Sequence, residues 1–304
     1  MTTPGRRLLL LHAHPDDETI MTGGTIARYL AEGVDVRVLT FTLGEEGEVI
    51  GDEWAQLAAD GGADQLGGYR IHELTSALAA LTPPGRAPLR PRFLGGAGRW
   101  RDSGMAGTPS AEHPRALAQG PFDAVVGALV DEIVDFDPQV VVTYDSAGTY
   151  GHPDHMMVHE ASMAALPIAT RRTGTDYLVY ESVTEDSALR AGLRAAAERV
   201  PDGWRLPRDG ELPSYPDGQV TTELDVSAVY ERKVDALAAH ATQVTVSPSR
   251  TDYALSNTIA QPILATEYFI LRRLDSPSSP DAGRRGTDLF RPDGVITDVT
   301  QAHP

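Results

Sequence analysis

Two short polar clusters in this chain contain the residue types that hold metal ions and transfer protons. The first is "HAHPDDE" at 12–18, and the second is "YGHPDH" at 150–155. Each contains His-Pro-Asp, and imidazole and carboxylate groups are common ligands of divalent transition metals in proteins. The chain has no cysteine, which excludes thiolate metal sites, disulfides and a cysteine nucleophile.

The spacing within and between the clusters predicts a catalytic metal site. His14 and Asp17 are three residues apart and can converge on one ion across a turn. A third ligand would come from the second cluster, either His152 or His155, and spacing does not choose between them. Two imidazoles and one carboxylate leave a coordination position open, as in catalytic zinc sites, where a water reaches a pKa of about 7. Asp16 would then be free to act as general base.

Simpler interpretations exist for each cluster alone. An Asp pair at a helix start usually caps the helix, and a single His after a strand is usually only hydrogen-bonded. Two His-Pro-Asp clusters after two predicted strands favour a shared metal site instead. Neither a Gly-x-Ser-x-Gly sequence nor a glycine-rich dinucleotide loop after the first strand is present, so a serine hydrolase or a nucleotide-binding oxidoreductase is poorly supported.

Apolar strands and helices alternate around the clusters. Buried strands are predicted over 6–14, 34–43, 139–145 and 176–183, and a short strand over 91–96. Helices are predicted over 17–32, over 54–81 with glycine interruptions, over 122–136, over 155–166 with an end at Pro167, and over 227–241. This alternation predicts an α/β fold, a Rossmann-like, mainly parallel sheet flanked by helices. Ligands bind such sheets at the carboxyl ends of the strands, where both clusters should lie.

The chain divides into a predicted catalytic core, 1–180, and a smaller C-terminal part, 181–304, that completes the site. The C-terminal part contains a lid-like loop rich in proline and glycine at 200–219, a helix and a tail. We expect it to pack with the core as one domain. Residues 275–286 have the composition of a flexible surface segment, and the sequence assigns no role to 275–304.

Composition limits the partners and the compartment. The net charge is −17 without a basic run, which argues against nucleic acid or an anionic membrane as partner. No segment approaches the roughly 20 apolar residues of a membrane span. The N-terminal leucine run is too short for a signal peptide. We therefore expect a cytoplasmic protein with a small-molecule substrate, and the sequence does not indicate an oligomeric state.

The clusters "AHPDDE" and "GHPDH" resemble those of the PIG-L/LmbE-like zinc deacetylases, which remove acetyl groups from N-acetylglucosamine-containing substrates. Three longer strings, "TLGEEGEVIGDEWAQLAAD", "FLGGAGRWRDSGMAGT" and "VVVTYDSAGTYGHPDH", are similar to the branch of that family that acts in mycothiol biosynthesis. The resemblance covers most of the chain. It implies hydrolysis of the acetamide of 1-D-myo-inosityl 2-acetamido-2-deoxy-α-D-glucopyranoside (GlcNAc-inositol), with release of acetate.

The resemblance also implies which residues hold the ion. His14, Asp17 and His155 match the family's metal ligands, and Asp16 matches its general base. The ion would be Zn²⁺, although Fe²⁺, Co²⁺ or Ni²⁺ suit the same ligands.

Further roles follow from the same resemblance. His152 matches the catalytic histidine, an electrostatic stabiliser or general acid, and Asp154 would orient it. Tyr150 matches the residue that polarises the substrate carbonyl and stabilises its oxyanion. Three positions match residues that bind the sugar or the inositol: Arg70, Asp102 and Glu48.

Two competing functions remain. Mycothiol S-conjugate amidases are similar and share the metal site, but they tend to carry a lysine near the position of the apolar Ile20. A non-catalytic metal- or sugar-binding module would not need Asp16, His152 and Tyr150 beside the ligands. His240, in the helix predicted over 227–241, is expected to have a structural role.

Overall fold

The leucine run forms β1 (Arg7–His12), an inner strand of a six-stranded sheet, in a computed structural model that describes residues 5–58, 64–272 and 285–291. The strand order is β2-β1-β3-β4-β9-β5. The other strands of this sheet are β2 (Asp35–Thr40), β3 (Val140–Thr143), β4 (Leu178–Val183), β5 (Thr222–Asp225) and β9 (Thr266–Arg272). β1 to β4 are parallel, and β9 is antiparallel to both β4 and β5. The predicted α/β fold with a mainly parallel sheet is confirmed.

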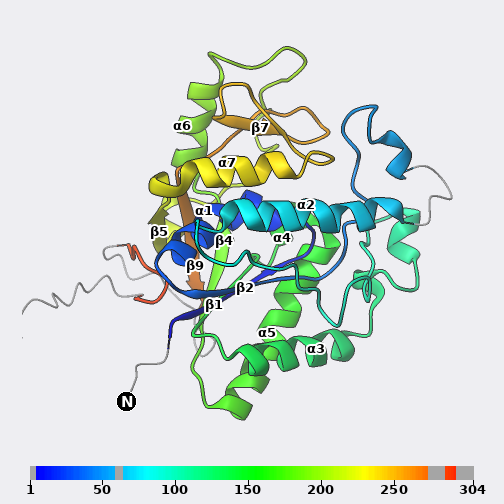
Figure 1. The fold of residues 1–304 in the computed structure, drawn as a ribbon, viewed down its shortest axis with the longest axis vertical. Helices are drawn as coiled ribbons and strands as arrows, with labels where there is room; N and C mark the ends of the chain where they lie inside the picture. Colours follow the sequence, from blue (N-terminus) through cyan, green and yellow to red (C-terminus); the bar gives the residue numbers. More distant parts are fainter. Residues whose placement is uncertain (1–4, 59–63, 273–284, 292–304) are drawn as a thin grey trace, which may run out of the picture.

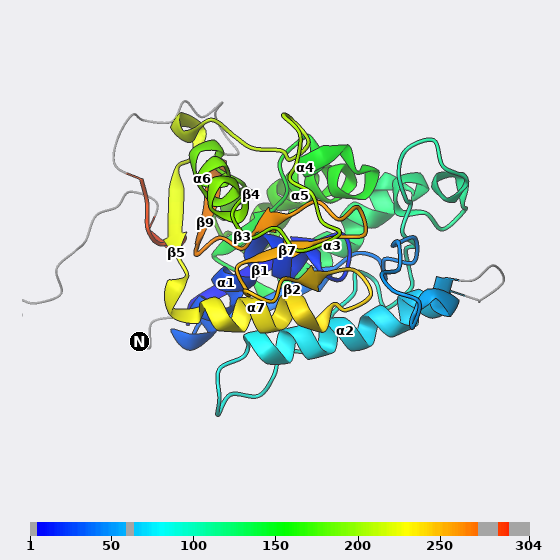
Figure 2. The same ribbon diagram turned by 90° about the horizontal axis from the view of Figure 1, so that it is seen from above.

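Helices cover both faces of the sheet because successive side chains of β1 point to opposite sides. Leu8 and Leu10 pack in the core beneath α1 (Asp17–Ala31), α2 (Gln65–Leu81) and α7 (Tyr230–Ala239). Leu9 and Leu11 pack in the opposite core, beneath α3 (Phe122–Phe136) and α5 (Pro153–Thr173). Figures 1 and 2 show α2 and α7 side by side on one face and the α3–α5 pair on the other.

The remaining elements lie mostly in the second half of the chain. A small antiparallel sheet contains β6 (Thr245–Val246), β7 (Asp252–Ala254) and β8 (Gln261–Pro262). Two other helices are α4 (Gly148–Gly151) and α6 (Asp186–Ala196). Single 3₁₀ turns are η1 (Ala55–Ala58), η2 (Pro109–Glu112), η3 (Leu117–Gln119), η4 (Asp217–Gln219) and η5 (Ser227–Val229). Since β5 and β9 belong to the main sheet, residues beyond 181 extend the sheet of the first half.

Two predicted elements are wrong. Residues 91–96 form no strand: Phe93 makes an isolated bridge to Thr40, and Gly95 and Gly96 turn the chain away with positive φ. The helix predicted to end at Pro167 continues to Thr173. A proline inside a helix costs about 3 kcal/mol, but Leu166 and Ala169 on either side of it are fully buried, and their burial favours continuing the helix.

Other predictions hold with shifted bounds. The helix expected over 227–241 begins at Tyr230, after the η5 turn. The segment predicted as flexible, 275–286, lies mostly outside the described residues. Among the residues that the structure describes, no helix is long and apolar enough to cross a membrane.

The strand order determines where a ligand can bind. β1 has β2 on one side and β3 on the other, and β4 lies beyond β3. The connection after β1 therefore runs to one side of the sheet, and the connection after β3 runs to the other. The carboxyl ends of strands at such a switch point border the binding crevice of open α/β sheets. The clusters at 12–18 and 150–155 follow β1 and β3, and this arrangement brings them together.

Candidate metal centre and active-site cavity

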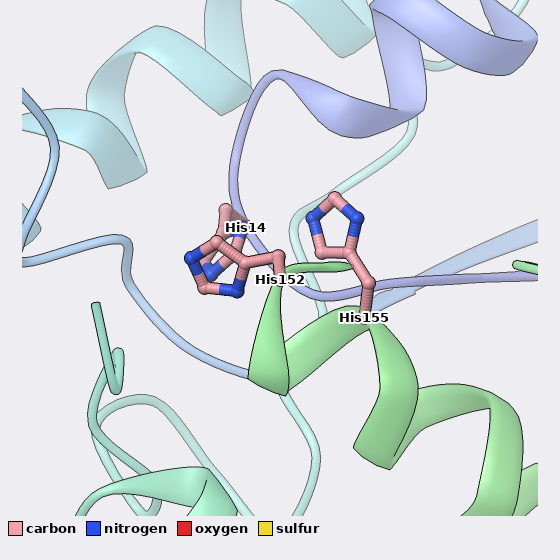
Figure 3. Close-up of side chains that lie close together, drawn as sticks. All are labelled: His14, His152 and His155. Carbon is pink, nitrogen blue, oxygen red and sulfur yellow. The ribbon is translucent and has the colours of Figure 1, made fainter. Parts of the chain in front are cut away.

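Three imidazoles from the two clusters converge. His14 follows β1, whereas His152 is the N-cap of α5 and His155 lies in its first turn. The ring centroid of His14 is 4.6 Å from that of His152 and 5.3 Å from that of His155. One nitrogen from each of the three rings lies within 4.8 Å of the others. Figure 3 shows these side chains between the loop after β1 and the start of α5. All three are buried.

Asp17, the first residue of α1, lies against two of these imidazoles. Its Oδ2 is 3.2 Å from Nδ1 of His14 and 3.4 Å from Nε2 of His155. Ligands about 2.1 Å from one tetrahedral ion lie roughly 3.4 Å apart. Both ring nitrogens of His155 are buried, and neither has a hydrogen-bond partner among the residues that the structure describes. Such a nitrogen beside a carboxylate is what a metal ligand requires.

His14 is held from its other side by two carboxylates. Its Nε2 lies 3.3 Å from Oδ2 of Asp154 and 3.4 Å from Oδ1 of Asp102. Although burial lowers the pKa of His14, Asp102, Asp154 and Asp17 together raise it well above 6.5. A proton shared by Nε2 with these carboxylates leaves Nδ1 free to bind a cation, as carboxylate–histidine–metal arrangements do. Asp102 and Asp154 with His14 also form a second donor set within 4.8 Å, which shares His14.

Asp16 does not cap α1 with its side chain, so the simple interpretation of the acidic pair fails for this residue. Its carboxylate instead lies 3.1 Å from Nη2 of Arg70 and lines a cavity of about 660 Å³. Burial, opposed by Arg70 and reinforced by Asp17, raises the pKa of Asp16 to about 6. A carboxylate with such a pKa is suited to accepting a proton near neutral pH.

His152 is oriented by the backbone of α5. The N–H of Asp154 donates to its Nδ1 at 3.2 Å, which places the proton of a neutral ring on Nε2. Burial and the charges of His14 and His155 lower the pKa of His152 to about 3. The carboxylate of Asp154, which the sequence predicted to orient His152, accepts from Ser103 instead and lies against His14. Asp154 therefore contacts His152 through its backbone N–H.

Tyr150 lines the cavity from the loop between β3 and α5, in which α4 is a single turn with non-helical backbone angles at Thr149 and Tyr150. Its side chain is 56 % exposed, and its ring centroid is 5.2 Å from that of His155. The preceding Thr149 has φ 63° and ψ −69°, a conformation rarely adopted by a β-branched residue. The carboxylate of Asp145 accepts from the backbone N–H groups of Ala147 and Thr149. These bonds hold the loop that presents Tyr150.

The three residues predicted to bind sugar or inositol all line the same cavity. Arg70 is buried, and its guanidinium donates to the carbonyl oxygens of Gly44 and Pro15 as well as pairing with Asp16. Asp102 is buried beside His14. Glu48 lies at the cavity wall and accepts from the Ser256 hydroxyl at 2.7 Å. Arg70 and Asp102 thus also contact Asp16 and His14, respectively.

Four residues to which the sequence assigned no part in the site also contact it. Tyr144 is fully buried, its ring stacks on His155 with centroids 4.1 Å apart, and its hydroxyl donates to Asp17. Asp145 holds the Tyr150 loop, and Glu18 and His240 form a buried pair beneath Asp16. The position of Tyr144 and Asp145 at the end of a predicted buried strand was the available signal. The Glu18–His240 contact joins residues too distant in sequence to reveal it.

Comparison with known proteins places this geometry in a family. The family model PIG-L, described as GlcNAc-PI de-N-acetylase, matches residues 9–166, just over half of the chain. A protein of Gordonia bronchialis named 1D-myo-inositol 2-acetamido-2-deoxy-alpha-D-glucopyranoside deacetylase is 69% identical over 95% of this chain and 100% of its own length. A protein of the same name from Rhodococcus opacus is 60% identical over 94% of this chain and 97% of its own.

Solved structures share the fold at low identity. The N,N'-diacetylchitobiose deacetylase from Pyrococcus horikoshii is 16% identical with a TM-score of 0.50, over 78% of this chain and 70% of that one. GalB from Pseudomonas putida, a 4-carboxy-2-hydroxymuconate hydratase, is 17% identical with a TM-score of 0.52, over 90% of this chain and 100% of that one. A deacetylase and a hydratase thus share this fold, so the fold alone does not select a reaction. From the matched region and the identity of its relatives, the chain belongs to the PIG-L (GlcNAc-PI de-N-acetylase) family.

Proposed function

We propose that this protein is a metal-dependent N-deacetylase that hydrolyses the acetamide of GlcNAc-inositol and releases acetate and the free amine. The observation that carries the proposal is that His14 and His155 both lie against the Asp17 carboxylate, with the Asp16 carboxylate in the same cavity. The names of relatives up to 69% identical along nearly the whole chain support the choice of substrate. This reaction is a step in mycothiol biosynthesis.

His14, Asp17 and His155 would hold the ion. His155 is favoured over His152 as the third ligand, because its ring nitrogens have no hydrogen-bond partner within the described part of the chain, whereas Nδ1 of His152 accepts a backbone N–H. Two imidazoles and a carboxylate suit Zn²⁺, and Fe²⁺, Co²⁺ and Ni²⁺ accept the same set. When bound, the ion supplies Lewis acidity, which polarises the amide carbonyl and lowers the pKa of a water.

The chain's own groups would handle the protons and the developing charge. Asp16 accepts a proton from the attacking water, and Arg70 holds its carboxylate in place. The hydroxyl of Tyr150 donates to the oxyanion of the tetrahedral intermediate. The Nε2–H of neutral His152 is a second donor, and Asp16 returns its proton to the leaving amine. Asp102 and Glu48, on the cavity wall, would bind hydroxyl groups of the sugar or the inositol.

The test is acetate release by the purified protein, reconstituted in turn with Zn²⁺, Fe²⁺, Co²⁺ and Ni²⁺. We expect turnover of GlcNAc-inositol with at least one of these ions, slower turnover of free N-acetylglucosamine, and loss of both on chelation. Binding of the substrate to metal-loaded protein without acetate release would instead favour a non-catalytic sugar-binding module.

A second activity is favoured by the extent of the cavity. The cavity continues beyond the three histidines to apolar side chains that an acetyl group is too small to contact. These are Leu189, Leu212, Pro213 and Leu264. A larger acyl group, as in a mycothiol S-conjugate, could occupy this region. Ile20 also lines the cavity, at the position where the amidases tend to carry lysine. We therefore expect kcat/KM for GlcNAc-inositol to exceed that for a mycothiol conjugate, with the conjugate turned over measurably.

A further inference from the structure

The backbone of Asp16 is strained. Its φ of 119° and ψ of −35° lie in a region that residues with a Cβ rarely adopt and that costs of order 1–3 kcal/mol. Its carbonyl oxygen accepts from the N–H groups of Thr19 and Ile20 at 3.0 and 2.9 Å, which fixes the carbonyl side to the first turn of α1. A second contact is needed on the amide side to hold this conformation.

Glu18 contacts the N–H of this peptide, while Arg70 donates to its carbonyl oxygen, that of Pro15. Oε2 of Glu18 accepts from the N–H of Asp16 at 2.9 Å. The other oxygen, Oε1, lies 2.9 Å from Nε2 of His240 and accepts from the Thr19 hydroxyl at 2.5 Å. Glu18 and His240 are both 0% exposed. His240 follows the last turn of α7, so the C-terminal part of the chain supports the loop after β1.

This arrangement differs from ordinary helix capping. In a capping box, a glutamate in the first turn reaches back to the N-cap N–H while the N-cap side chain caps the helix in return. Here Glu18 accepts from the N–H of the N-cap residue Asp16, but the Asp16 side chain makes no capping bond. Its carboxylate faces Arg70 and the cavity instead.

We infer that Glu18, supported by His240, is a positioning residue that holds the strained backbone of Asp16 and thereby directs the Asp16 carboxylate into the cavity. The inference deepens the proposed function, because it rests on Asp16 acting as general base. Neither residue is among those that line the cavity, so their loss should change the orientation of the base and leave ligand binding in place.

The kinetic test uses matched pairs of variants of the full-length, metal-loaded protein. Glu18→Met removes both acceptors at similar volume, and Glu18→Gln keeps one. We expect Glu18→Met to lower kcat by roughly 10- to 100-fold, as small misplacements of reacting groups do, with KM and metal content within about twofold of wild type. Glu18→Gln should recover most of kcat. His240→Leu and His240→Gln should repeat the pattern with smaller losses.

The control is Glu73 in α2. Its buried carboxylate accepts from the backbone N–H and the hydroxyl of Thr242, just beyond the end of α7, both at 2.8 Å. Glu73→Met should lower the melting temperature and leave kcat unchanged. If Glu73→Met lowers kcat as much as Glu18→Met, a general structural defect explains both, and the inference is overturned.

A stability measurement tests the strain without relying on catalysis. Asp16→Gly removes the strain and Asp16→Ala retains it, so the glycine variant should melt a few degrees above the alanine variant while Glu18 is present. When Glu18→Met is added to each, the backbone of the alanine variant can relax, and the difference should shrink. An undiminished difference would show that another contact holds the backbone, and the inference would fail.

The two tests separate this inference from the proposed function. Wild-type protein that releases no acetate with any of the four metals would refute the proposed function. The comparison of Asp16→Gly with Asp16→Ala would still decide whether Glu18 holds the backbone. An active wild type with kcat unchanged in Glu18→Met would refute the inference alone.

Discussion

The hydroxyl of Tyr144 donates a hydrogen bond to Oδ2 of Asp17 at 2.7 Å and accepts one from the N–H of Ala13 at 2.8 Å. Tyr144 is thus bonded both to the proposed metal ligand Asp17 and to the loop that carries His14, another proposed ligand. Its ring stacks on the third proposed ligand, His155. This single residue after β3 orients groups contributed by both clusters.

Tyr144→Phe should therefore weaken metal binding. The ring stays, but Asp17 loses a donor and the Ala13 N–H loses its acceptor. We expect affinity for Zn²⁺ to fall by about 10- to 100-fold, as for partners of other metal ligands, measured by competition with a chromophoric chelator. Tyr177→Phe is the control, because the Tyr177 hydroxyl bonds Thr173 outside the cavity. Equal affinities in wild type and Tyr144→Phe would contradict this role.

Substituting alanine for Asp16 or for Asp17 should affect metal content and acetate release differently. Asp17→Ala removes a proposed ligand, so the purified protein should hold little metal. Asp16→Ala should retain its metal while acetate release falls by at least about 100-fold, within the range for general base catalysis. Metal content by elemental analysis and acetate release are measured on the same preparations. The reverse pattern would exchange the two roles.

Tyr150→Phe tests the oxyanion donor. The side chain is largely exposed, so removing its hydroxyl should not destabilise the protein. Loss of one oxyanion donor costs about 100-fold or more in kcat, and we expect that decrease with metal content unchanged. Turnover near the wild-type rate would remove Tyr150 from the mechanism.

The strain at Thr149 predicts that Thr149→Gly is more stable than Thr149→Ala, the reverse of the usual order. Alanine is normally more stable than glycine by about 0.5–1 kcal/mol in regular structure. At φ 63° and ψ −69° the glycine variant should instead be more stable, by about 1 kcal/mol, in denaturant unfolding. Thr170 within α5 is the control and should keep the normal order. A normal order at both positions would mean that the loop relaxes without cost.

The Glu18–His240 pair predicts a pH window of stabilisation. Burial would raise the pKa of Glu18, but His240 and the hydrogen bonds to Glu18 outweigh burial and lower it from 4.5. Burial would lower the pKa of His240, but Glu18 and Asp16, opposed by Arg70, raise it from 6.5. The glutamate's contribution is present above about pH 4.5 and is lost as pH falls through its lowered pKa. The contribution of His240 is complete below about pH 6.5 and is lost as pH rises through its raised pKa.

Between these limits the pair should stabilise the fold most. The melting temperature of wild type minus that of His240→Leu should therefore be largest between about pH 4.5 and 6.5, where both contributions are complete. Thr170→Ala, a substitution within α5 that changes no ionisable group, serves as control and should show a flat difference. A flat difference for His240→Leu as well would mean that the pair is not ionised in the folded protein.

The elements that the sequence predicted well are those in which periodicity and burial agree. The helix expected over 122–136 matches α3 residue for residue, because its apolar residues recur at helical spacing and Pro138 follows. The leucine run and "QVVVTYD" were identified as buried strands because their apolar runs are continuous. In contrast, β5 to β9 were missed: most are short, and β6, β7 and β8 have two or three residues each, too few to establish a period of two.

By itself, the sequence determined the residue types at the site and the strand ends that carry them, because an apolar run followed by His-Pro-Asp limits where charged groups can lie. Only the tertiary structure decided their partners. It placed Asp154 against His14, Tyr144 against Asp17, and His240 against Glu18, because the order β2-β1-β3 brings the β1 and β3 loops together and α7 packs over α1. Contacts across such separations depend on how the helices pack on the sheet, which no local pattern in the sequence records.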